Sequence, residues 1–282
     1  MARRFRAAGR DGLAATMGKS LLLGAGHVHL HLISRCQELQ VGGHEVTVVA
    51  PEVFWYSGLA SGVVAGDYPP ELDRIDGERL ATAAGVSCLR TTATAIDSAS
   101  KVVTTANGRQ VGYDVCSLNV GSTSDPSLLA GQHPRLYRVK PVRLLFELCA
   151  DLDIKVSAGE APSVVVIGAG VTGTELACCF RHRLSRNGGR GRVSLVGRGG
   201  VTPELPGRAR RSLERGLARM KVRFNQAGVD RLEEGRVVLD DGTELPADAV
   251  VLATGPRAPR FLRSSGLKCH DGDDAVIVDR HL

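Results

Sequence analysis

The chain has 282 residues, of which 43% are hydrophobic, so it is long enough and apolar enough for two domains with cores of their own. Aromatic residues make up only 4%, which argues against a base-stacking surface for nucleic acid. The net charge is +6, and the positive charges are mostly scattered arginines, which is typical of a solvated surface. The alternative, more specific interpretation is that they bind a phosphate-bearing ligand.

Seven cysteines occur without a CxxC pair or metal-ligand spacing, and no apolar run approaches the ~20 residues of a membrane span. We therefore expect a reduced, cytoplasmic protein with no metal, no nucleic-acid partner and no transmembrane segment. This excludes disulfide-rich secreted scaffolds and integral membrane proteins.

Residues 1–17 are arginine-rich and lack hydrophobic periodicity, and we interpret them as a non-structural extension. An apolar strand is expected at 20–23, a helix at 30–40 and a further strand at 46–49. Between the first strand and the helix lies a glycine turn, Gly24-Ala25-Gly26-His27. Its third glycine position is filled by His29.

Three histidines, His27, His29 and His31, surround the start of this helix. His27 and His31 share a helix face, which suggests a metal site, but no third Cys, Asp or Glu ligand lies nearby in sequence. We therefore interpret the three as helix-start residues beside a bound phosphate.

The next segment alternates turn signals with short apolar runs. Residues 51–70 are expected to form a loop and residues 73–84 a helix. Short strands are expected at 86–96, 101–105, 109–113 and 115–120, with an Asn-Gly turn at 107–108 and Gly121 after the last strand. Prolines mark a linker over 126–140, and an amphipathic helix follows at 142–152.

The strongest motif is SVVVIGAGVTGTELA at 163–177. Its β-branched run is typical of a strand buried on both faces of a parallel sheet. Strand, glycine turn and helix in this order form the dinucleotide-binding fingerprint, in which Gly168 permits the tight turn and Gly170 lets the backbone approach a pyrophosphate. Gly173 lets the helix lie close on the strand.

After this motif we expect a helix at 208–220 and strands at 193–196, 222–224, 237–239 and 249–252. The order repeats the first half of the chain: a glycine turn opens each half, at Gly24 and Gly168, and a glycine follows its last buried strand, at Gly121 and Gly255. Such an internal duplication indicates two mononucleotide-type units and hence two nucleotide ligands.

In combination, five stretches resemble the two-dinucleotide-binding-domain flavoproteins of the pyridine nucleotide-disulfide oxidoreductase superfamily. Within it, the sequence is most similar to type II NADH dehydrogenase-like proteins and to the FAD oxidoreductases associated with selenide, water dikinase. The stretches are residues 21–30, 56–68, 113–122, 164–177 and 250–259.

The resemblance implies an α/β fold of two Rossmann-like, three-layer (ββα) domains, each with a small β-meander and the second inserted in the first. The FAD-binding domain would comprise residues 18–137 and 257–282, and the NAD(P)H-binding domain residues 138–256.

The resemblance also implies the site residues. At the FAD pyrophosphate it places Gly24, Ala25, Gly26 and His27; Pro51 near the adenosine ribose; Ala93 near the adenine; and Ser57, Gly121 and Lys140 toward the flavin. At the nicotinamide nucleotide it places Gly168, Gly170, Val171, Thr172, Gly173 and Gly255. Glu175 is expected near the contact between nicotinamide and flavin; the alternative is an acid stabilised by the helix dipole.

The activity implied is that of an enzyme, an FAD-dependent NAD(P)H oxidoreductase passing hydride to flavin and then electrons to a quinone or other small acceptor. The alternative is a non-catalytic, truncated nucleotide-binding fragment of such an enzyme. A Rossmann dehydrogenase without flavin would explain Gly168 but not the duplicated first unit.

Three departures from the family pattern matter. The acid that usually ends the second strand of each unit is missing: Pro51 stands near that position in the first unit and Arg198 in the second. An arginine there favours the 2′-phosphate of NADPH, unless it is only a solvated turn residue. No CxxxxC pair follows the first unit, which argues against disulfide chemistry. Residues 275–282 resemble the strand before the family's Gly-Asp flavin segment, so we interpret the chain as C-terminally truncated, with peripheral membrane contact expected only through the missing part.

Overall fold

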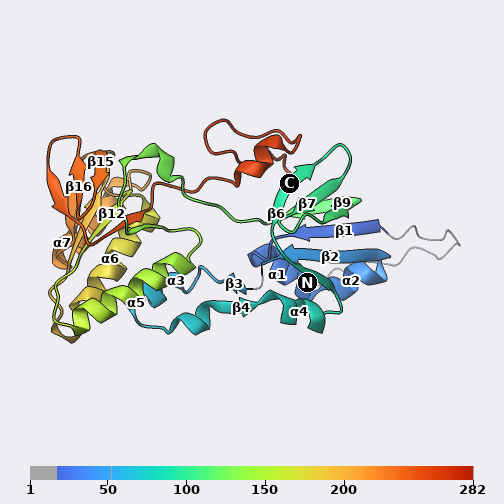
Figure 1. Ribbon diagram of the computed structural model, residues 1–282, viewed down its shortest axis with the longest axis horizontal. Coiled ribbons are helices and arrows are strands. Elements are labelled where there is room, and N and C mark those ends of the chain that lie inside the picture. The colour runs from blue at the N-terminus through green and yellow to red at the C-terminus, as the bar shows by residue number, and fades with distance from the viewer. Residues whose placement is uncertain (1–17, 52, 282) are drawn as a thin grey trace, which may run out of the picture.

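The computed structural model describes residues 18–51 and 53–281, and it contains two α/β units side by side (Figure 1). Each unit has three layers: helices, a parallel sheet and a small antiparallel meander. The expected Rossmann-like α/β fold class is confirmed. The extension predicted over 1–17 lies outside the described residues.

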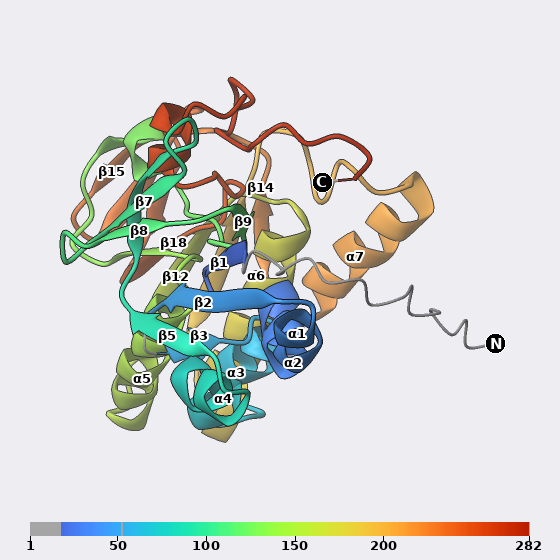
Figure 2. The same cartoon turned by 90° about the vertical axis from the view of Figure 1, so that its right-hand side faces the viewer.

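The sheet of the first unit has the order β5-β2-β1-β9, with all strands parallel. Its strands are β1 (Gly18–Leu23), β2 (His44–Ala50), β5 (Ser87–Arg90) and β9 (Val115–Leu118). One face is covered by α1 (His27–Ser34), α2 (Cys36–Val41) and α4 (Gly77–Ala83); Figure 2 shows α1 and α2 beside β2 and α4 below β5. The other face is covered by the meander of β6 (Ala93–Asp97), β7 (Val102–Thr105) and β8 (Gln110–Gly112).

The sheet of the second unit has the order β11-β18-β12-β13-β14 and is also parallel. Its strands are β11 (Leu136–Arg138), β12 (Ser163–Ile167), β13 (Arg192–Val196), β14 (Arg223–Asn225) and β18 (Ala249–Leu252). Helices α5 (Arg143–Ser157), α6 (Val171–Ser185) and α7 (Gly207–Arg219) pack on one face. On the other lies the sheet of β10 (Ala130–Gly131), β15 (Val229–Glu233), β16 (Arg236–Leu239) and β17 (Glu244–Pro246).

The first strand of each unit is buried on both faces, as its sequence predicts. In β12, Val164 and Val166 face the helices, whereas Val165 and Ile167 face the meander. In β1, Leu22 faces the helices, while the leucines on either side of it face the meander. Because successive side chains of a strand point to opposite faces, each strand belongs to two cores.

The excursion between β2 and β5 departs from the predicted loop over 51–70 and helix over 73–84. It contains β3 (Val53–Trp55), α3 (Ala60–Ala65), the 3₁₀ turn η1 (Pro70–Asp73) and β4 (Arg74–Asp76), and the helix after it begins only at Gly77. Helix α3 packs on α6 and α5, so Val63 and Val64 belong to the core of the second unit. Its partners lie about a hundred residues away in the sequence, which is why local pattern does not reveal it.

Other boundaries also differ. The helix predicted over 30–40 is two helices separated at Arg35, and the strand predicted over 86–96 is two strands that join different sheets. The linker predicted over 126–140 contains β11, which pairs with β18. The strand expected from residue 275 is wrong for the described residues up to 281, where Val276 forms only an isolated bridge with Cys269.

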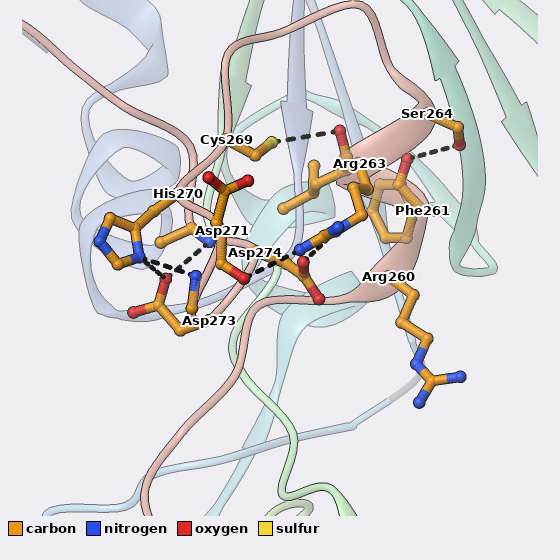
Figure 3. A network of polar contacts seen from close by, with 12 residues as sticks. Arg260, Phe261, Arg263, Ser264, Cys269, His270, Asp271, Asp273 and Asp274 are labelled. Carbon is orange, nitrogen blue, oxygen red and sulfur yellow. Dashed lines mark hydrogen bonds and ion pairs between the residues drawn. The ribbon is translucent and has the colours of Figure 1, made fainter.

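After β18 the chain returns to the first unit through the 3₁₀ turn η4 (Arg260–Ser264), whose Leu262 packs against Ile96 and Val103. Figure 3 shows the polar contacts that close this segment, among them an ion pair between Arg263 and Asp274. Nearby, the ring of His270 contacts the carboxylate of Asp273 at 3.3 Å. In the described part of the chain, no helix is long and apolar enough to cross a membrane.

Candidate functional site

The two glycine turns occupy matching places in their sheets. Each follows the central strand at its carboxyl end, at the point where the connections leave for opposite sides, and such switch points are where nucleotides bind in open α/β sheets. The backbone bonds also match: Gly24 N donates to Val49 O (2.7 Å), and Gly168 N donates to Val196 O (2.8 Å).

In the second unit the glycines are required by close backbone approach. Gly168 has φ +109°, and a Cβ there would lie 2.3 Å from the carbonyl oxygen of Ala253. A Cβ on Gly173 would lie 1.8 Å from the carbonyl oxygen of Gly168. Helix α6 therefore lies directly on the turn, as the fingerprint predicts.

In the first unit, a histidine rather than a glycine makes the contact between the helix and the glycine turn. Gly24 has φ +88°, and a Cβ there would lie 2.1 Å from Asn119 O. His29, at the third glycine position, is completely buried: its Nδ1 lies 2.7 Å from Gly24 O and its Nε2 lies 2.8 Å from Ser117 Oγ. This pattern suits a neutral ring that donates from Nδ1 and accepts at Nε2, and burial lowers the pKa of His29.

The interpretation of His29 as a residue beside a phosphate is therefore wrong, because both its ring nitrogens bond inward. His27 is exposed and packs against the rings of Phe54 and Tyr56, with centroids 5.6 and 4.7 Å away. Within the described residues, no group of His, Cys, Asp and Glu is arranged to hold a metal ion.

The two helix N-termini differ in what caps them. Among the described residues, no side chain caps the N-terminus of α1, and its first turn carries no acidic residue. At α6, the backbone N–H of Val171 donates to Oε1 of Glu204 at 3.0 Å. A pyrophosphate fits the first terminus as it stands, because the free N–H groups and the dipole both favour an anion there.

Two cavities meet at the second glycine turn. The larger, of about 520 Å³, lies between the units, with Ser122, Ser124 and Lys140 on one side and Gly168, Gly170, Val171, Thr172, Glu204, Thr254 and Gly255 on the other. The smaller, of about 380 Å³, runs along the carboxyl ends of β12 and β13 and includes Arg198 and Gly228. Gly168, Gly170, Glu204 and Thr254 line both.

Arg198 marks the far end of the smaller cavity. Its Nε lies 3.6 Å from Oδ2 of Asp240, and its side chain is 76% exposed. The guanidinium lies across Gly228, where a Cβ would meet Arg198 Nε at 2.2 Å. A cation thus stands where the second strand of the unit ends, held by a solvent-screened ion pair of small energetic weight.

Lys140 lines the larger cavity, and its charge interacts with that of Asp73. Burial lowers the pKa of Lys140, and the Asp73 carboxylate opposes that change. Asp73 is itself completely buried, and burial raises the pKa of its carboxyl to about 6, against the opposing effects of the Leu59 backbone N–H and the Lys140 charge. The pair places two titratable groups beside the space between the units.

The remaining predicted site residues lie either in the first unit or on α6. Ala25 is buried, Ala93 opens β6, Pro51 and Gly121 are exposed after strands of the first sheet, and Ser57 is exposed between β3 and α3. Glu175 is exposed on α6, beyond its first turn, and lines neither of the two cavities. Because the dipole effect falls off within the first turn, this position does not support the alternative interpretation of Glu175 as a dipole-stabilised acid.

Sequence reasoning missed Asn119, Asp73 and Glu204. Asn119 follows β9 as Ala253 follows β18, so aligning the two halves would have found it. Glu204 lies in a loop of glycine and proline residues after β13, and only the folded turn brings its side chain to α6. Asp73 carries no sequence signal, because its burial results from packing of the excursion.

The comparisons agree with this geometry. The chain matches the pyridine nucleotide-disulphide oxidoreductase family over residues 19–282. An NADH dehydrogenase-like protein of Mycobacterium tuberculosis is 32% identical over 189 residues, which is 63% of this chain and 47% of that protein. The chain therefore spans about half the length of the curated relatives that it matches.

Solved structures share the fold. The water-forming NADH oxidase from Lactobacillus brevis, bound to NADH, has a TM-score of 0.77 at 21% identity, covering 93% of this chain and 59% of that chain. The sulfide:quinone oxidoreductase from the hyperthermophilic bacterium Aquifex aeolicus has a TM-score of 0.77 at 18% identity, covering 93% and 65%. With two fingerprint units, matching sheets and a family match over almost the whole length, the chain belongs to the pyridine nucleotide-disulphide oxidoreductase family.

Proposed function

We propose that the protein binds FAD in its first unit and NAD(P)H in its second and catalyses electron transfer to a quinone or another small acceptor. The observation that carries this proposal is the cavity of about 520 Å³, which residues of both units line and into which the second glycine turn opens. FAD, when bound, supplies the redox chemistry by taking up hydride from NAD(P)H and passing electrons on.

The first unit would hold the FAD pyrophosphate on the N-terminus of α1. Gly24 and Gly26 permit close approach of the backbone, and the amides of α1 donate to the phosphate oxygens. We assign Pro51 to the ribose region and Ala93 to the adenine region, because both follow strands at the carboxyl edge of the sheet.

The second unit would bind NAD(P)H along its two joined cavities. The smaller cavity takes the adenosine part, where Arg198 faces a 2′-phosphate and favours NADPH. The larger cavity takes the nicotinamide and directs it toward the first unit, whose Ser122 and Ser124 form part of the lining.

We assign Lys140 to the flavin end of the larger cavity. Its ammonium would stabilise negative charge there, and the Asp73 carboxylate opposes the lowering of the Lys140 pKa by burial. Glu175, exposed on α6, is the second candidate for a residue near the reacting rings, and its role stays a prediction.

The test is to purify the chain, record its absorption spectrum with and without added FAD, and follow NADPH and NADH oxidation with menadione or ferricyanide. Flavin bands, thermal stabilisation by FAD and acceptor-dependent oxidation support the proposal. Gly24→Ala should abolish flavin retention, whereas Gly108→Ala, also at positive φ but with open space around it, should retain flavin. A chain that FAD does not stabilise and that oxidises no NAD(P)H would refute it.

The alternative, a nucleotide-binding protein without turnover, gives a different result in the same assay. It predicts stabilisation by NADPH, about 2.7 kcal/mol at 100 times the dissociation constant, with no oxidation under any condition.

A further inference from the structure

The N-terminus of α6 is already occupied by a carboxylate of the protein itself. Oε1 of Glu204 accepts the backbone N–H of Val171 at 3.0 Å, and Gly170, the N-cap of α6, makes no side-chain cap of its own. The first turn of α6 contains no acidic residue. The anionic group at this helix end is therefore a side-chain carboxylate from a loop, 33 residues further along the chain.

The loop that carries Glu204 is anchored at its base. Thr202 N donates to Ala169 O at 2.7 Å, and Leu205 N donates to Thr202 O at 3.0 Å, closing a turn with Pro203 at its second position. Thr202 is buried and has φ +42°, a conformation that a β-branched residue keeps only when its surroundings impose it. The backbone is thus fixed, while the side chain of Glu204 is exposed and is held by its hydrogen bond to Val171 N.

Glu204 also stands between the two cavities, since it lines both of them. Its Oε1 lies close to Gly170, where an added Cβ would be 3.6 Å away. A dinucleotide that filled both cavities would have to place its diphosphate at this junction. The carboxylate and the diphosphate would then need the same amide and the same space.

We propose that Glu204 is an internal competitor of the diphosphate, which the nicotinamide nucleotide displaces by rotating this one side chain. The proposal rests on the proposed function, since it concerns how the second unit takes its ligand. Among the residues that the structure describes, no carboxylate accepts a hydrogen bond at the N-terminus of α1, so the two glycine turns differ in this contact. The carboxylate of Glu204 weakens binding of the nicotinamide nucleotide and so promotes its release. This suits a cofactor that exchanges during turnover rather than one that stays bound.

The test compares Glu204→Ala with Glu214→Ala, which removes an exposed charge on α7 from a residue that lines neither cavity. Binding of NADPH, ADP-ribose and 2′-AMP to the full chain is measured by calorimetry. Removing the competing carboxylate should tighten NADPH and ADP-ribose by roughly 5-fold, the weight of one charge and one hydrogen bond at an exposed helix end. The affinity for 2′-AMP, which has no diphosphate, should not change, nor should any affinity in Glu214→Ala.

A second measurement reads the contact directly. Hydrogen exchange at the Val171 amide should be faster in Glu204→Ala than in the unmodified protein without ligand, and equally slow in both with ADP-ribose. If ADP-ribose and NADPH bind Glu204→Ala and the unmodified protein with equal affinity, the competition between Glu204 and the diphosphate is refuted while the proposed function stands. If neither binds any variant, nucleotide binding by the second unit fails as well. If Glu204→Ala binds all three ligands more tightly by the same factor, the carboxylate acts only through its charge, and the competition between Glu204 and the diphosphate is refuted.

Discussion

The parallel sheets of the two units share the order of four strands, to which the second unit adds β11, but the helix after the glycine turn contacts the turn differently in each. In the second unit, Gly173 lets α6 lie on the turn; in the first, His29 takes that position and joins α1 to the turn by hydrogen bonds. The meanders also match, down to a β-bulge in the first hairpin of each, at 93–95 and 229–231. A fold can therefore conserve its topology while the contact between helix and turn changes from backbone packing to a buried side chain.

The difference also bears on ligand exchange. In the described part of the chain, no side chain caps the N-terminus of α1, whereas Glu204 accepts a hydrogen bond from the N-terminus of α6. The two glycine turns thus have similar backbones but differ in the group that an incoming diphosphate must displace. Mutations at matching positions of the two turns can measure that difference.

The largest effect is expected for Gly173→Ala. The new Cβ would meet the backbone oxygen of Gly168 at 1.8 Å, and backbone cannot give way as a side chain can, so we expect a loss of about 3 kcal/mol or more in the free energy of unfolding. Urea denaturation measures it.

Gly216→Ala on α7 is the matched control. It also adds a methyl group to a helical glycine, but nothing lies within 4 Å of it. The control should be neutral or stabilising by up to about 1 kcal/mol. Similar losses in both variants would show that α6 does not rest on the turn as described.

The corresponding position of the first unit should be costly for a different reason. His29→Ala leaves Ser117 Oγ and Gly24 O without their buried partner and opens a cavity, and we expect a loss of about 2–3 kcal/mol. His31→Ala, on the exposed side of the same helix, should cost little by comparison. Thermal unfolding of the pair measures the difference.

His29 also gives a pH dependence of defined sign. Its pKa is lowered in the folded protein, so below about 6.5 the unfolded chain binds more protons and the free energy of unfolding falls as the pH falls. The contribution is complete above that pH. Denaturation midpoints measured at neutral and mildly acidic pH should converge for His29→Gln, and an unchanged slope in that variant would contradict the assignment.

A smaller effect is expected at Gly26. The Cβ of Gly26→Ala would meet the Asn119 side chain at 2.2 Å, and a side chain can move, so we expect a loss of about 1–2 kcal/mol. Adding Asn119→Ala should restore stability and FAD retention. Asn119→Ala should not rescue Gly24→Ala, whose Cβ meets the backbone of Asn119 instead.

The smallest effect on stability is expected at Arg198. Its ion pair with Asp240 is exposed, so Arg198→Ala should change the free energy of unfolding by less than about 0.5 kcal/mol. The ratio of NADPH to NADH affinity should nevertheless fall by about 10-fold, because a charged partner of the 2′-phosphate is lost. Arg231→Ala, which removes a similarly exposed, ion-paired arginine from β15, should leave the ratio unchanged.

The sequence by itself determined the fold class, the duplication and the two glycine turns. These follow from local rules: β-branched runs buried on both faces, glycines where φ is positive or backbones touch, and helix-compatible segments directly after them. Residues 164–177 carry all these signals within one continuous segment, which is why that prediction held.

The tertiary structure alone decided where α3 packs, which way His29 points and which side chain covers α6. Each depends on contacts between residues far apart in the chain: Val63 with the core around α6, His29 with Ser117, and Glu204 with Val171. Hydrophobic period and turn chemistry report only on a residue's near neighbours in sequence, whereas burial and hydrogen bonding at these positions are set by whichever distant segment folding brings beside them.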